Sequence, residues 1–131
     1  MPHKNQLRIT SHEVISSAGV QRFYTPYVRD GQVWEVRRFT WETDKATSGG
    51  NTRARIYIDR GGILFPIAEQ DAPAADTLYS IVDPFFLIEG ERLVVELDQG
   101  QAATTVESHI IGFEEQFANP GPAGALYPPM L

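Results

Sequence analysis

The feature that most constrains this chain is the alternating pattern of residues 91–97 (ERLVVEL). There, the apolar side chains Leu93, Val95 and Leu97 share one face of an extended strand, whereas Arg92, Val94 and Glu96 share the other. A period of two is the mark of a strand with one buried face. This strand lies in the middle of residues 85–113, with a glycine-containing turn on either side. We therefore expect a short strand, the alternating strand and a last long strand to form a meander against which the other strands pack.

The rest of the chain repeats this design. Turn residues recur about every 8–12 positions, and no segment of useful length has the period of an amphipathic helix. We therefore predict eight or nine strands in an all-β, antiparallel two-sheet sandwich of jelly-roll type. Besides those of residues 85–113, strands are expected at residues 6–17, 20–28, 32–43, 52–59, 63–68 and 78–82.

Local signals predict further details of these strands. Arg29-Asp30-Gly31 is typical of a β-hairpin turn. Pro26 and Pro66 remove backbone donors, which places Pro26 at a sheet edge or a strand end and Pro66 on an edge strand. The first strand alternates loosely, which suggests a bulge near His12.

The longest predicted strand, residues 32–43, changes parity midway. Trp34 and Val36 fall on one face, whereas Phe39 and Trp41 fall on the opposite face. A β-bulge at residues 37–38 would turn all four side chains inward, and we favour it. Without the bulge, one aromatic pair stays on the surface, where Trp34 or Trp41 would suit stacking on a sugar ring.

Composition places the chain in the globular class. It has 131 residues, 42% of them hydrophobic and 11% aromatic, which is enough for one domain with its own core. It has no cysteine, so disulfides and thiolate metal sites are excluded. No stretch approaches 18 apolar residues, and the N-terminus lacks a basic segment followed by an apolar one. We therefore expect neither a membrane span nor a classical secretion signal.

The two halves of the chain differ strongly in charge. Residues 1–60 have a balance of +4, whereas residues 61–131 have a balance of −10. Two explanations are open: strands of the two halves pair and neutralise each other, or the molecule has a basic side and an acidic side that pack together in an assembly. Binding to nucleic acid is not expected, because the basic residues are scattered and the net charge is −6.

The sequence lacks the residue patterns of catalytic and metal sites. The histidines His3, His12 and His109 do not have the spacing of a zinc site. No serine lies in a nucleophile elbow, and no acidic loop has the pattern that binds calcium. We therefore expect a protein that is not an enzyme and has no catalytic residue, metal or cofactor.

The ends of the chain differ from the middle. Residues 1–5 are polar, and we expect them to form an N-terminal arm before a sandwich domain of residues 6–117. Residues 118–131 contain four prolines and no charge, so we expect an extended C-terminal arm. The apolar arm should lie either on its own domain or on another chain, and we favour the second. The candidate binding residues of the arm are Leu126, Tyr127, Pro128, Pro129, Met130 and Leu131.

Four segments together resemble the small β-sandwich virion proteins of tailed bacteriophages, which include head-decoration proteins and minor head or tail components. They are VWEVRRFTW (residues 33–41), TRARIYIDRGG with ILFPI (52–67), FFLIEGERLVVEL (85–97) and IIGF (110–113). These motifs are structural and cover roughly residues 31–113. The resemblance implies a role in binding and scaffolding, often in symmetric oligomers whose termini reach neighbouring subunits.

This resemblance leads to the functional hypothesis. We expect a head-decoration (cement) protein that stabilises the capsid by bridging subunits, assembled in the host cytoplasm and located in the virion. Its partners would be copies of itself, in a trimer or other ring, and a major capsid or other virion protein, without nucleic acid or membrane. The alternatives are a neck, collar or tail component, and a carbohydrate-binding or receptor-binding module.

Overall fold

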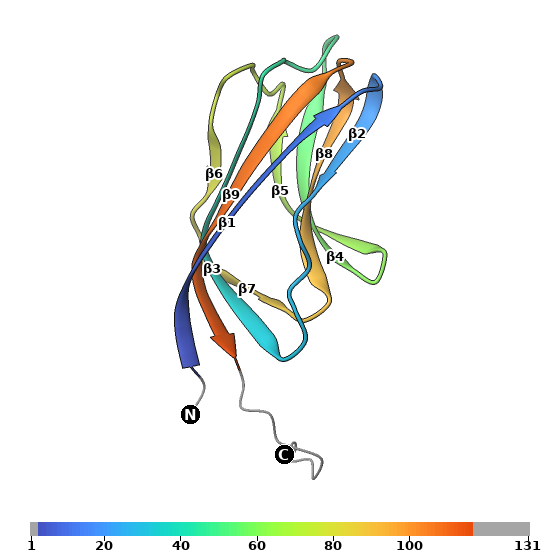
Figure 1. Ribbon diagram of the computed structural model, residues 1–131. Helices are drawn as coiled ribbons and strands as arrows, with labels where there is room; N and C mark the ends of the chain where they lie inside the picture. Colours follow the sequence, from blue (N-terminus) through green and yellow to red (C-terminus); the bar gives the residue numbers. More distant parts are fainter. Residues whose placement is uncertain (1–2, 117–131) are drawn as a thin grey trace.

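The computed structural model describes residues 3–116 as two antiparallel β-sheets packed face to face (Figure 1). Sheet A has the order β1-β9-β3-β6, with β7 also paired to β3, and sheet B has the order β2-β8-β4-β5. The strands are β1 (His3–Ile15), β2 (Gly19–Tyr24), β3 (Gln32–Thr43), β4 (Arg53–Arg60), β5 (Ile63–Asp71), β6 (Tyr79–Ile81), β7 (Phe85–Ile88), β8 (Glu91–Gly100) and β9 (Thr104–Gln116).

The strand order is that of a jelly roll. β6 and β7 pair with different parts of β3, so they occupy one edge position end to end and act as a single interrupted strand. Eight strands then remain, four in each sheet, and the described chain passes repeatedly from one sheet to the other. The predicted all-β, jelly-roll-like sandwich is therefore confirmed.

The predicted meander of residues 85–113 is wrong in its pairing, although its three strands exist. β7 and β9 belong to sheet A, whereas β8 lies between them in sequence but belongs to sheet B. The position beside the start of β8 is taken by residues 25–28, where the Val28 amide donates to the Glu91 carbonyl oxygen at 2.9 Å. Alternation defines the buried face of a strand but does not define its neighbour, so the two hairpins inferred from the turns do not form.

The hairpin predicted at residues 29–31 is also absent. β2 ends at Tyr24 in sheet B and β3 begins at Gln32 in sheet A, so the segment between them crosses from one sheet to the other. A turn remains, in which the Gln32 amide donates to the Arg29 carbonyl oxygen at 3.2 Å. The prediction of a turn at residues 29–31 is therefore correct, but β3 enters the opposite sheet instead of pairing with β2.

The bulge predicted in β3 is confirmed. The register between β3 and β9 shifts between Val36 and Arg38, which leaves Arg37 as the extra residue. Trp34 and Trp41 are each 2% exposed, and Val36 and Phe39 are fully buried between the sheets. The proposed surface position of Trp34 or Trp41 is therefore corrected, because the bulge brings both parities of β3 to the same face.

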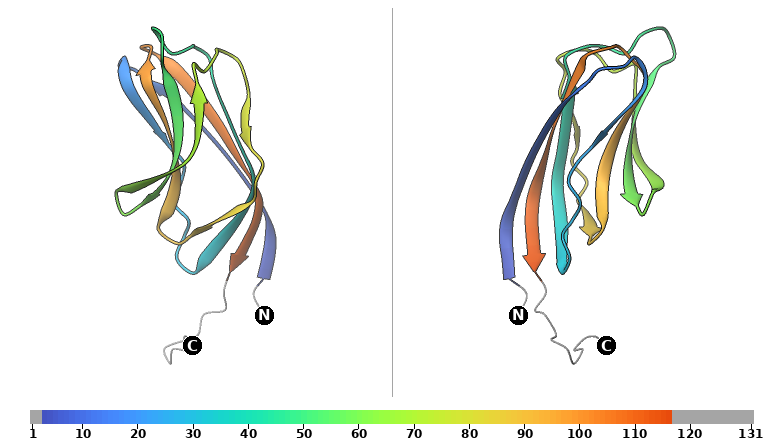
Figure 2. Two further views of the ribbon diagram at one scale, coloured as in Figure 1. Left: turned by 180° about the vertical axis from the view of Figure 1, so that it is seen from behind. Right: turned by 45° about the vertical axis from the view of Figure 1, so that its right-hand side comes forward.

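The first strand begins and ends earlier than expected and is regular. β1 begins at His3, so residues 3–5 belong to the sandwich rather than to a free arm. It pairs with β9 without a register shift from His3 to Ile15, and the bulge expected near His12 does not form. Figure 2 shows that the start of β1 and the end of β9 lie at the same end of sheet A.

Both assignments from proline are confirmed. β5, which contains Pro66, is the edge strand of sheet B, as predicted. Pro26 lies between β2 and β3, outside the strands, so it marks a strand end. The core between the sheets is apolar and consists of Leu7, Phe23, Val28, Trp34, Val36, Phe39, Trp41, Ala54, Ile56, Leu87, Leu93, Val95, Leu97, Val106 and Ile110.

Candidate protein-binding face

The most distinctive polar surface is the outer face of sheet A. Because β1, β9 and β3 pair in a ladder, their outward side chains form rows across the three strands. We call three successive rows the basic row, the middle row and the acidic row. In that order their members are Arg8, Ile111 and Arg38; Thr10, His109 and Thr40; and His12, Glu107 and Glu42.

The basic row carries two cationic side chains, Arg8 and Arg38. Among the described residues, neither of them forms an ion pair with a carboxylate. The two flank Ile111, to which both are paired in the ladder. A shallow hollow of about 430 Å³ lies over this part of the sheet, lined by Arg8, Thr10, Arg38, Thr40, Leu78, His109 and Ile111.

The acidic row has the opposite character. Glu42 and Glu107 are direct neighbours across β3 and β9, and like charges in that position destabilise a sheet. A hollow of about 240 Å³ beside them is lined by His12, Glu42, Thr43, Asp44, Asp76, Thr105 and Glu107. The excess of negative charge on this part of sheet A suits a cationic partner.

The middle row separates these two charged rows. The hydroxyl of Thr10 and Nδ1 of His109 are 3.1 Å apart, and Nε2 of His109 is 3.8 Å from a carboxylate oxygen of Glu107. Ser80 of β6 pairs with Thr40 and continues this row toward the edge of the sheet. The exposed apolar side chains of Leu78 and Val82 stand on either side of Ser80 in the sequence.

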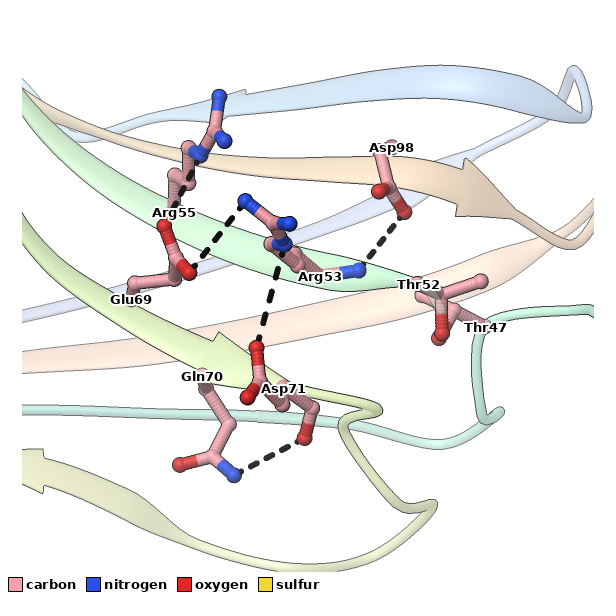
Figure 3. Close-up of polar contacts among 8 residues, drawn as sticks. All are labelled: Thr47, Thr52, Arg53, Arg55, Glu69, Gln70, Asp71 and Asp98. Atoms are coloured by element: carbon pink, nitrogen blue, oxygen red, sulfur yellow. Dashed lines mark hydrogen bonds and ion pairs between the residues drawn. The ribbon is translucent and has the colours of Figure 1, made fainter. Parts of the chain in front are cut away.

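Sheet B presents a different surface, because its charged side chains are paired with each other. Figure 3 shows Arg53 and Arg55 of β4 beside Glu69 and Asp71 of β5. The Nε of Arg55 lies 3.2 Å from Glu69, and the backbone amide of Arg53 donates to Asp98 at 2.9 Å. Each basic residue comes from the first half of the chain and each acid from the second.

The same pairing continues across the rest of sheet B. Arg22 donates to Glu96 at 2.8 Å, and Arg60 lies 2.6 Å from the buried carboxylate of Glu91. Part of the difference in charge between the two halves is therefore neutralised within sheet B, as one of the two explanations predicted. Sheet A, by contrast, keeps separate basic and acidic rows, so both explanations apply to different faces.

A buried ion pair on sheet B is shared with two tyrosines. Arg92 donates from Nε to Asp59 at 2.8 Å, which lowers the pKa of this carboxyl although its burial acts in the opposite direction. The guanidinium also lies 4.0 Å and 4.3 Å from the ring centres of Tyr24 and Tyr27. These tyrosines are 38% and 50% exposed, so they are accessible aromatic side chains on this face.

The two tryptophans do not contribute to any surface site. Nε1 of Trp34 donates to Glu114 at 3.1 Å, and the ring of Trp41 packs 4.9 Å from that of Tyr79. The candidate binding residues of the C-terminal arm, Leu126 to Leu131, lie outside the described residues.

The histidines are placed without zinc-site geometry. His12 and His109 both lie on the outer face of sheet A, in adjacent rows and on different strands. In residues 3–116, no three histidine or acidic side chains gather closely enough to hold a metal ion.

No helix of the described chain is long and apolar enough to cross a membrane.

Sequence reasoning did not identify Arg8, Arg38, Glu42 and Glu107 as a common surface. The signal in the sequence that could have identified part of this surface is the alternation of side chains along β3. Once the bulge at residues 37–38 is accepted, this alternation directs Arg38 and Glu42 away from the core. The pairing of β3 and β1 with β9 was not deducible, because those strands are distant in sequence.

Comparison with known proteins gives remote structural likeness only. No protein-family model matches the chain, and no curated protein matches it significantly. A Bacillus endospore appendage protein, from a family of disulfide-linked pili, has 11% identity and a TM-score of 0.45 over 90% of this chain and 92% of its own.

Two other solved structures have slightly lower TM-scores. A chain of infectious bursal disease virus (Gt strain) has 13% identity and a TM-score of 0.42, over 95% of this chain and 35% of its own. The Eiger TNF protein of S. frugiperda has 10% identity and a TM-score of 0.40, over 95% and 98%. At these values no function is transferred from any of them.

Proposed function

We propose that this protein is a non-enzymatic structural component of a virus particle, and specifically a head-decoration protein of a tailed bacteriophage. Its task would be mechanical: it would bridge neighbouring subunits and so stabilise the shell. The resemblance of residues 31–113 to small phage virion proteins supports this proposal, as does the jelly-roll strand order, which recurs in viral capsid domains. A neck, collar or tail position is the alternative within the particle.

The observation that carries the proposal is the outer face of sheet A. Arg8 and Arg38 have no acidic partner within residues 3–116, although the protein carries a net charge of −6. Two acidic side chains, Glu42 and Glu107, are held side by side two rows away. This separation of charge over an open sheet surface is suited to contact with another protein and gives it a defined orientation.

The C-terminal arm is the second part of the proposal. Residues 118–131 would dock on a neighbouring chain through Leu126, Tyr127, Met130 and Leu131, and the prolines would limit the entropy lost on ordering. Sheet A offers an apolar surface at the end where β9 finishes: Phe86 and Ile88 of β7 are 63% and 44% exposed. The equivalent surface of a neighbour is our candidate receiver for the arm.

The proposal is tested on particles. Virions induced from a host strain that carries the coding sequence should contain the protein in a copy number that matches the symmetry of the shell. Antibody labelling should mark the head surface, and particles of a deletion strain should lose DNA at lower temperature than the parent. Labelling confined to the neck or tail would favour the alternative position. Absence of the protein from purified particles would contradict the proposal.

One specific observation favours a second candidate, a carbohydrate-binding module. Tyr24 and Tyr27 are exposed beside the polar groups of Arg92 and Glu96 on sheet B, and aromatic rings with adjacent polar groups are suited to stacking on sugars. Glycan-array binding that is lost in the variant Tyr24→Ala with Tyr27→Ala would support it. Unchanged binding in that variant, or no binding by the wild type, would reject it.

A further inference from the structure

We infer that the outer face of sheet A is a self-complementary interface, on which a second copy of this chain packs about a two-fold axis. This inference rests on the proposed function, because it names the surface by which the structural protein associates with itself. The observation that supports this interface is the order of the three rows on sheet A. The basic row and the acidic row lie at equal distances on either side of the hydroxyl and imidazole groups of the middle row.

The symmetry follows from this order. Successive rows are two residues apart, or about 6.8 Å along a strand. A two-fold axis in the interface plane, running along the middle row at right angles to the strands, reverses the strand direction in the second copy. The basic row of each copy then lies over the acidic row of the other. A two-fold axis parallel to the strands would instead place basic row on basic row, and like charges oppose that arrangement.

The first arrangement gives the charged groups of both rows partners. On β3, Arg38 of one copy faces Glu42 of the other, and the symmetry makes this contact twice. Arg8 and Arg38 also flank the position that Glu107 of the second copy occupies over Ile111. The repulsion between Glu42 and Glu107 within one copy is relieved when two guanidinium groups approach them. A two-fold contact in which the same patch serves both copies is the commonest form of symmetric association.

The described chain also limits the alternatives. The outer face of sheet B already pairs Arg22, Arg53, Arg55 and Arg60 with acids of the same chain. Its charges are therefore less available to a partner than those of sheet A. An acidic segment of a different protein would satisfy the basic row, but it would leave the acidic row unmatched. A second copy satisfies both rows at once, and for that reason we commit to it as the occupant.

The test exploits the geometry of one strand. Arg38 and Glu42 of the same copy are four residues apart on β3, about 14 Å, and are therefore too distant to pair with each other. In Arg38→Glu, two acids face each other across the interface, and in Glu42→Arg two arginines do. Each single variant should weaken the dimer at least about tenfold in sedimentation velocity, compared with the wild type.

Mixing the two variants is the decisive step. In a mixed dimer, the new glutamate at position 38 faces the new arginine at position 42, while the unchanged Glu42 and Arg38 face each other as in the wild type. One contact is thus restored with reversed sign and the other in its original form. We expect a one-to-one mixture to form the mixed dimer at near wild-type affinity, which native mass spectrometry identifies by its mass.

The double variant Arg38→Glu with Glu42→Arg should also dimerise, because both of its contacts are restored with reversed sign. Circular dichroism must show that each variant is folded, which the outward position of both side chains favours. The control is Arg29→Glu, which changes the same charge in the exposed link between β2 and β3. It should leave the dimer unchanged.

Three results would overturn the inference. They are a wild-type protein that stays monomeric at its highest soluble concentration, single variants that dimerise normally, and a mixture that forms no mixed dimer. These measurements use the isolated protein, so their failure is distinct from absence of the protein from virions.

Discussion

A single glycine allows β9 to pass the bulge of β3. Gly112 pairs with Val36, next to the extra residue Arg37, and a Cβ atom at this glycine would overlap the backbone carbonyl oxygen of Glu35. The obstacle is backbone, so it cannot turn away as the end of a flexible side chain would. The bulge that buries both tryptophans therefore depends on a residue without a side chain on the neighbouring strand.

We predict that Gly112→Ala destabilises the protein by about 1–3 kcal/mol, the usual cost of forcing an extra group into a packed site. Urea unfolding measures this free energy. The matched control is Gly50→Ala, because nothing in the described structure lies within 4 Å of a Cβ at that loop position. Equal stability of Gly112→Ala and the wild type would show that the close approach of the two strands is wrong.

The buried carboxylate of Asp59 gives a second prediction at this scale. Its pKa lies below the usual value of 3.8, mainly because Arg92 donates a hydrogen bond to it. A depressed pKa means that its stabilising contribution is present above pH 3.8 and is lost as the pH falls through the lower pKa of the folded state. We expect Asp59→Asn to cost about 2 kcal/mol at pH 7.

The difference between variant and wild type should shrink as the acid is protonated below the usual pKa. Urea unfolding at pH 7 and at the lowest pH where both proteins fold measures it. Arg55→Gln, which breaks an exposed pair with Glu69, is the control and should cost much less. A constant difference at all pH values would contradict the role given to the Asp59 charge.

The position of a single residue was predictable where the alternation of apolar side chains changes from one face of a strand to the other. The parity change between Trp34 and Trp41 has few solutions, and the bulge is the one that buries both. Asp59 was not predictable in the same way, because its burial depends on Arg92 and on the tyrosines of a segment distant in sequence.

At the scale of elements, the strands were predictable and their partners were not. Residues 91–97 alternate as expected, and Leu93, Val95 and Leu97 are at most 1% exposed. The neighbours of β8 are β2 and β4, both far away in the sequence, and no local pattern encodes such a pairing. The turns at Gly31 and Gly90 were recognised as turns, but a turn into the opposite sheet carries the same residues as a hairpin turn.

The C-terminal arm is an element whose role was predicted from composition alone, and it remains a prediction. We expect deletion of residues 118–131 to leave the melting temperature of the isolated domain nearly unchanged, because the described core is built from residues 7–110. Incorporation into particles should be abolished. Differential scanning calorimetry and quantitative electrophoresis of particles measure these two effects.

A full-length variant tests whether incorporation depends on the apolar side chains of the arm or only on the presence of the segment. Replacing Leu126, Tyr127, Met130 and Leu131 by serine keeps the chain and its prolines but removes the apolar anchors. We expect this variant, like the deletion variant, not to be incorporated into particles. Full occupancy of particles by either variant would contradict docking on a neighbour. Loss of folding on deletion would show instead that the arm belongs to its own domain.

At the scale of the whole molecule, the two faces of the sandwich differ in how they use charge. Sheet B neutralises part of the difference in charge between the halves of the chain by internal ion pairs (Figure 3). Sheet A leaves a basic and an acidic row separated by the middle row. The imbalance between the two halves was visible in the sequence, but its distribution over two faces depends on the strand order, which was not.

The most direct test of self-association through sheet A uses the absence of cysteine from the chain. Ser80 continues the middle row, so in the proposed dimer it faces its own copy across packed sheets about 10 Å apart. The variant Ser80→Cys, treated with a bismaleimide reagent of similar span, should give a covalent dimer. Val20→Cys on sheet B, where Val20 is 65% exposed, should stay monomeric. Equal dimer yields from the two variants, or no dimer from Ser80→Cys, would contradict the account.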